Sequence, residues 1–103
     1  MNNKKPGQPK QLKMKIDPKE EGGIYSNIAT VLSSENEFIL DFGMILPGTE
    51  FIRIGSRVVM NPRTAKQLLM ALSHNIKNFE NKFGEIKLPQ RQPTLHRGPE
   101  MAN

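Results

Sequence analysis

The chain contains no cysteine among its 103 residues. Disulfide bonds and thiolate metal sites are therefore excluded. Histidine is scarce as well, since only His74 and His96 are present. No group of histidine and carboxylate residues has the spacing of a metal site, so we expect neither a metal nor another cofactor.

The motifs of common catalytic chemistry are also missing. The sequence has no G-x-S-x-G, no phosphate loop and no G-x-G-x-x-G. Ser26, Ser33 and Ser34 have no partner that would activate a nucleophile. The five phenylalanines and the one tyrosine fall in expected strands and in an expected helix, which favours a packing role over base stacking. We therefore predict that the protein is not an enzyme.

Long apolar runs are absent too. No stretch approaches the roughly 20 apolar residues of a membrane span. The N-terminal lysines are not followed by the apolar run of a secretory leader. We expect a cytoplasmic protein that does not associate with membranes.

The net charge is +5, and its distribution is uneven. Residues 1–22 hold six lysines and three acidic residues, whereas basic and acidic residues nearly balance over residues 23–88. Nucleic-acid-binding domains usually concentrate positive charge on one folded face. The pattern therefore favours a solubilising basic tail, and binding of nucleic acid by the lysine-rich N-terminus is the alternative.

Three segments are expected along the chain. Residues 1–22 form a flexible basic tail, residues 23–88 form one domain, and residues 89–103, with three prolines, form a disordered tail. A domain of this size has a marginal core, because ordering each residue costs about 1.5 kcal/mol. Without disulfides or a metal, self-association is the remaining way to stabilise it.

The order of elements predicts an α+β fold: a small antiparallel meander of three to four strands and one long C-terminal helix. Strands are expected at residues 23–32, 37–46 and 51–60, joined by turns at 33–36 and 47–50. Two further segments leave alternatives open. Residues 11–16 form an edge strand or belong to the tail, and residues 85–89 form a short strand or only pack against the domain through Ile86 and Leu88.

The helix has clear ends. Asn61 is a typical N-cap, Pro62 suits the first helical position and Gly84 suits the end. Between them an apolar seam repeats at spacings of three and four residues, over about 30 Å. This seam consists of Ala65, Leu69, Leu72, Ile76, Phe79 and Phe83.

Both faces of the predicted sheet are apolar, and one helix covers one face. The first face is expected to hold Phe38, Leu40, Phe42, Ile52, Ile54 and Val58. A second copy of the chain is then needed for the other face, which favours a homodimer. The residues predicted for this interface, or for a partner protein, are Tyr25, Val31, Ile39, Ile45, Phe51 and Val59 on the sheet and Leu69, Leu72, Ile76 and Phe79 on the helix.

Asp41, Arg53 and Arg57 are expected to form a polar cluster on the second face. Such a cluster binds an anion or a peptide, or it forms cross-strand ion pairs at the rim of an interface, and we favour the ion pairs. Gly43 and Gly55 lie within strands and indicate bulges or close backbone approach.

Several motifs in order resemble a bacterial family of small uncharacterised proteins, a domain of unknown function. They are "GIYSN", "EFILDFG", "SRVVMNP" and "AKQLLMALSHNI", within residues 11–88. The resemblance implies no activity and no catalytic residues. Residues 24–83 also resemble, in topology alone, the SecB-type export chaperones.

We therefore predict a homodimeric interaction module that presents an apolar surface to a partner protein and, if that surface stays open, a holdase-like chaperone. The alternative is an accessory protein that binds nucleic acid.

Overall fold

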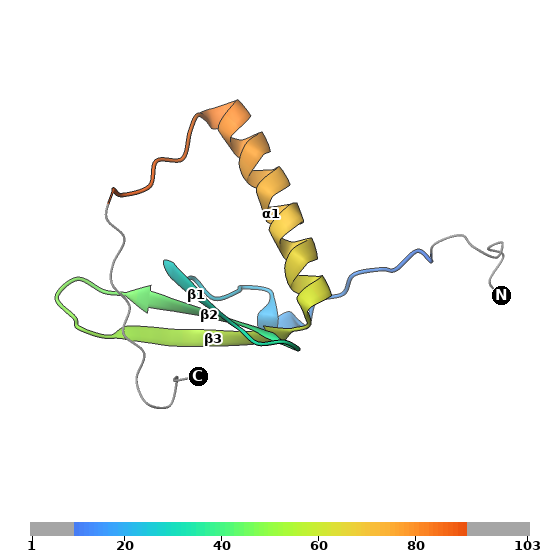
Figure 1. Cartoon of the computed structure of the whole chain (residues 1–103), viewed down its shortest axis with the longest axis horizontal. Coiled ribbons are helices and arrows are strands. Elements are labelled where there is room, and N and C mark those ends of the chain that lie inside the picture. Colours follow the sequence, from blue (N-terminus) through green and yellow to red (C-terminus); the bar gives the residue numbers. More distant parts are fainter. Residues whose placement is uncertain (1–9, 91–103) are drawn as a thin grey trace. The chain divides into compact units, whose positions relative to one another are not determined.

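The computed structural model describes residues 10–90, and the chain divides into two compact units between Met60 and Asn61. The first unit contains a 3-10 helix, η1 (Pro18–Glu20), and the strands β1 (Ile28–Ser33), β2 (Phe38–Ile45) and β3 (Ile52–Met60). The second contains the helix α1 (Pro62–Phe83) (Figure 1). We describe each unit by itself.

The strands form one antiparallel sheet in the order β1-β2-β3, so β2 is central and the other two are edges (Figure 1). The predicted α+β fold, a meander followed by one helix, is therefore confirmed. Within the described chain the sheet has three strands, because residues 11–16 and 85–89 contain no strand. The prediction of one domain over residues 23–88 stays a prediction.

β1 begins at Ile28, five residues later than predicted. The preceding residues instead form η1, whose Lys19 amide donates to the Asp17 carboxylate (3.3 Å), and a turn at Gly23, whose φ is +70°. The β-branched and aromatic residues of "GIY" suggested a strand, but Gly23 turns the chain before the strand can start.

A bulge sets which side chains share a face of the sheet. Phe42 pairs with Ser56 while Gly43 pairs with Ile54, so Gly55 is left out of the register. The alternation of side chains along β3 therefore reverses at Gly55.

Directly paired residues of an antiparallel sheet point to the same side, so the register assigns two faces. The Asp41 face consists of Ile28, Thr30, Leu32, Ile39, Asp41, Ile45, Ile52, Ile54, Arg57 and Val59. The Leu40 face consists of Ala29, Val31, Ser33, Phe38, Leu40, Phe42, Met44, Arg53, Ser56, Val58 and Met60.

Part of the predicted face assignment is wrong. Ile52 and Ile54 lie on the Asp41 face, because the bulge reverses the alternation that placed them with Val58. Val31 lies on the Leu40 face, because it pairs with Leu40 rather than with Ile39.

The described residues enclose a very small core. Leu40 is the only buried hydrophobic residue among them, and Asp41 is the only buried polar one. Both lie in the middle of the central strand, where β1 and β3 flank them on either side. Most large apolar side chains of residues 10–90 remain exposed.

The bounds of α1 agree with the predicted helix. The Asn61 side chain accepts a hydrogen bond from the Thr64 amide (2.7 Å), as an N-cap does. Gly84, with φ +104°, ends the helix by donating to the Glu80 carbonyl (2.9 Å). No residue of α1 is buried.

Candidate interaction surface

A charged pair occupies the centre of the Asp41 face. Arg57 Nε donates to Asp41 Oδ1 (2.6 Å) and Arg57 Nη2 donates to Asp41 Oδ2 (2.8 Å). The two residues are directly opposite in the β2–β3 register. Asp41 is 1% exposed, whereas the Arg57 side chain is 43% exposed. The carboxylate is therefore enclosed, and the guanidinium covers it at the surface of the sheet.

This geometry gives each partner a charged neighbour at hydrogen-bond distance. The hydrogen bond to Asp41 raises the pKa of Arg57 above its ordinary value. Burial opposes this rise in the pKa with a smaller effect, and the Asp41 charge adds a still smaller one in the raising direction. A two-point contact between guanidinium and carboxylate also fixes orientation. The pair therefore favours one register of β2 against β3, because a slip of one residue would turn a buried carboxylate away from its partner.

Arg53 does not join this pair, contrary to the predicted polar cluster. It pairs with Met44, which places it on the Leu40 face. The prediction assumed unbroken alternation along β3 and so counted Arg53 and Arg57 on one side. The bulge at Gly55 separates them.

Asn27, which lies just before β1, joins the pairing of β1 with β2. Its side-chain amide donates to the Ile45 carbonyl (3.0 Å) and accepts from the Ile45 amide (2.8 Å). Its own backbone amide donates to the Gly43 carbonyl (2.9 Å). The side chain thus acts like a peptide group and extends the β1–β2 pairing by one position. An asparagine that follows a glycine and a serine is typical of a turn in which the side chain bonds to the backbone, but the sequence does not indicate that Ile45 is the residue it bonds to.

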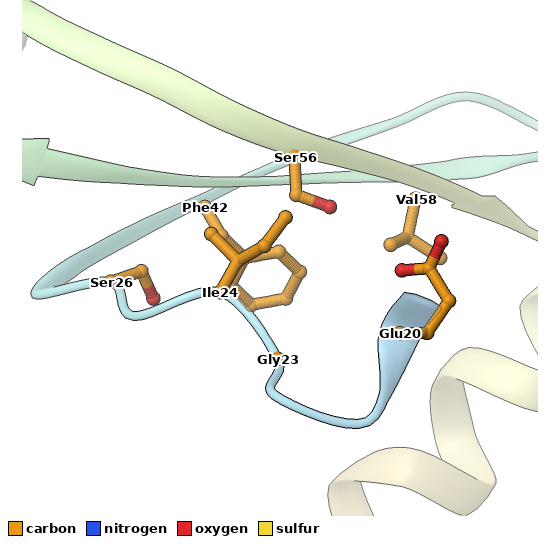
Figure 2. Close-up of a pocket in the computed structure, with 7 residues that line it drawn as sticks. All are labelled: Glu20, Gly23, Ile24, Ser26, Phe42, Ser56 and Val58. Atoms are coloured by element: carbon orange, nitrogen blue, oxygen red, sulfur yellow. The ribbon is translucent and has the colours of Figure 1, made fainter. Parts of the chain in front are cut away.

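A shallow pocket lies on the Leu40 face, with a volume of about 340 Å³. The chain between η1 and β1 forms one side of it, and β2 and β3 form the other. Figure 2 shows the Ile24 side chain next to the ring of Phe42, and the Glu20 carboxylate near Val58. Its lining residues are Glu20, Gly23, Ile24, Ser26, Phe42, Ser56 and Val58. It has one carboxylate and one region of apolar surface, without the second charged group that a catalytic pair requires.

The residues predicted for an interface lie on separate surfaces. Ile39, Ile45 and Val59 share the Asp41 face, whereas Val31 belongs to the Leu40 face. Tyr25 and Phe51 lie outside the strands and are about four-fifths exposed, at 76% and 81%. Four belong to the exposed seam of α1, namely Leu69, Leu72, Ile76 and Phe79.

Residues 10–90 hold no group of histidine, cysteine and carboxylate residues that could bind a metal ion. In the same part of the chain, every buried side-chain nitrogen and oxygen has a hydrogen-bond partner. None of the described helices has the length and apolar character that crossing a membrane requires.

Over residues 10–90 the chain is an α+β fold with one three-stranded antiparallel sheet followed by one long helix. The chain belongs to the family described as "Protein of unknown function (DUF3467)", which it matches over residues 1–88. This agrees with the resemblance inferred from the motifs. No curated protein and no solved structure matches the chain, and the likeness to SecB-type chaperones stays a prediction.

Proposed function

We propose that this protein is a non-enzymatic interaction module that works as a cytoplasmic homodimer. The observation that carries the proposal is the excess of apolar side chains that each unit, taken by itself, leaves exposed. Leu40 is the single buried hydrophobic residue of the described chain, while twenty large apolar residues remain exposed. Five of them, Leu69, Leu72, Ile76, Phe79 and Phe83, follow one another along the seam of α1, and a row of exposed apolar side chains of this kind marks a site of protein association.

Energetics support the same proposal. Burial contributes about 25 cal/mol per Å² of apolar surface, and ordering opposes it by about 1.5 kcal/mol per residue. Taken by itself, each unit encloses too little apolar surface to offset this ordering: Leu40 of the sheet is 9% exposed, and no residue of α1 is buried. A second copy supplies the missing apolar contact without a disulfide, which this cysteine-free chain cannot form.

The seam of α1 offers a direct test of self-association. We expect Leu72→Glu to raise the dimer dissociation constant at least tenfold, because it places a charge in the middle of the seam. The control is Gln67→Glu, which adds the same charge on the opposite side of the helix and should change the constant less than about twofold. Sedimentation velocity over a range of concentrations measures both variants. A wild-type chain that sediments as a folded monomer would remove the proposal.

A holdase-like chaperone is the more specific version of this function. It needs apolar surface that stays accessible after the dimer has formed, such as the pocket beside Ile24 and Phe42. We expect the dimer to suppress thermal aggregation of a model client at an equimolar ratio. If the client aggregates to the same extent with and without the dimer, the protein is not a chaperone, and the proposal of an interaction module is unaffected.

Binding of nucleic acid has weaker support. Lys10, Lys13, Lys15 and Lys19 are exposed, but they lie before the sheet rather than on a folded basic face. On the sheet itself, the basic residue at the centre of the Asp41 face is neutralised by its ion pair.

A further inference from the structure

The two edges of the sheet differ in how well they are protected against pairing with another strand. β3 carries Arg53 and Arg57 and contains the bulge at Gly55. Charged side chains and bulges are the devices by which natural edge strands avoid each other. β1 has the sequence "IATVLS", with no charged residue, no proline and no register shift against β2.

Within the first unit, the described strands leave the outer edge of β1 unpaired. No residue of β1 is buried, and Val31 is 55% exposed. The segment before β1 lines a pocket on the Leu40 face together with Phe42, Ser56 and Val58, which belong to the other two strands. In an antiparallel sheet, alternating residues of such an edge direct their backbone amides and carbonyls away from the neighbouring strand.

We propose that two copies of the chain pair through β1, antiparallel and about a two-fold axis, to form one six-stranded sheet. This inference rests on the proposed homodimer and specifies the contact between its two sheets. Pairing of two β3 edges would bring arginines of both copies together at a bulge. Pairing of β1 with the partner's β3 would leave a free edge at each end and would continue into a polymer. Pairing of β1 with β1 is the arrangement that closes at two copies.

The geometry limits the register of this contact. A two-fold axis perpendicular to the sheet keeps the same face of both copies on the same side. Directly paired residues point to one side of the sheet, so the axis must pass between a residue of β1 and the same residue of the partner. For a strand that spans Ile28–Ser33, the registers with the longest overlap centre on Thr30 or on Val31. In both registers the apolar Asp41 faces of the two copies become continuous.

Cysteine cross-linking tests the proposal cleanly, because the natural chain has no cysteine. Residues that face their own counterpart across paired strands have Cβ atoms about 5 Å apart, close to the separation in a disulfide. We expect Thr30→Cys or Val31→Cys to give a covalent dimer under mild oxidation. The control is Val58→Cys, which occupies the equivalent place on the other edge, since both valines pair with Leu40, and it should remain uncross-linked.

A charge at the edge provides a second measurement. We expect Val31→Lys to raise the dimer dissociation constant at least tenfold, because in either register the two lysines lie at the axis or one residue from it. Val58→Lys should change the constant less than about threefold. Circular dichroism confirms that each variant is folded. If the wild type is dimeric but Thr30→Cys and Val31→Cys cross-link no faster than Val58→Cys, the edge contact is overturned and the homodimer stands. A monomeric wild type would overturn both.

Discussion

Gly43→Ala should destabilise the protein by about 3 kcal/mol, because overpacking next to rigid backbone has few ways to relax. A Cβ atom at this position would lie 2.6 Å from the Arg53 carbonyl oxygen and 3.1 Å from Ile52 Cγ2. Gly43 is buried in the central strand. The atom nearest to the added Cβ, the Arg53 carbonyl oxygen, belongs to the backbone of the paired strand β3 and not to a flexible side chain. Chemical denaturation followed by circular dichroism measures the loss.

Gly55→Ala is the matched control for this prediction. Gly55 lies in β3 at the same bulge, but a Cβ atom there would meet only Ile24 Cγ2, at 3.7 Å. That is an ordinary van der Waals contact, so we expect a change within about 0.5 kcal/mol. Equal losses for the two variants would show that glycine flexibility at the bulge matters, rather than the close approach of β2 and β3.

Arg57→Ala should be the other strongly destabilising substitution. It leaves the Asp41 carboxylate, which is 1% exposed, without the guanidinium that neutralises it and donates two hydrogen bonds to it. An unpaired buried charge is far more costly than the loss of a surface charge. The control is Arg53→Ala, which removes an exposed arginine from the same strand with no ion pair to Asp41.

We expect the fall in the denaturation midpoint for Arg57→Ala to be roughly three to five times that for Arg53→Ala. The double variant Asp41→Ala with Arg57→Ala should recover part of the loss, because it removes the carboxylate together with its partner. Equal effects of the two single arginine substitutions would mean that the Asp41–Arg57 pair does not stabilise the sheet.

The helix was the most predictable element, and the reason is local. Its beginning depends on Asn61 and Pro62 and its end on Gly84, and each of these acts on backbone groups within one turn. The seam follows from spacings of three and four residues in the same segment. The structure has the helix at Pro62–Phe83, between the predicted capping residues.

The sheet was predictable in type and order but not in detail. Apolar alternation and turn residues indicated three antiparallel strands, and the pairing of Asp41 with an arginine of β3 was among the alternatives considered. The predicted start of β1 is too early. Ile24 and Tyr25 have side chains that favour strands, and this preference can be read from the sequence. The turn at Gly23 and the Asn27–Ile45 hydrogen bonds form only in the folded chain.

By itself, the sequence determined the fold class, the capped helix with its apolar seam, the glycines that mark a strand irregularity, and the exclusion of disulfides. These follow from residue type and from spacing along one segment. Only the tertiary structure decided that the alternation reverses at Gly55, so that Arg57 and not Arg53 meets Asp41 and the isoleucines of β3 change face. The physical reason is that a bulge is defined by which residues of two strands lie opposite each other, and that register is set by contacts between strands distant in sequence.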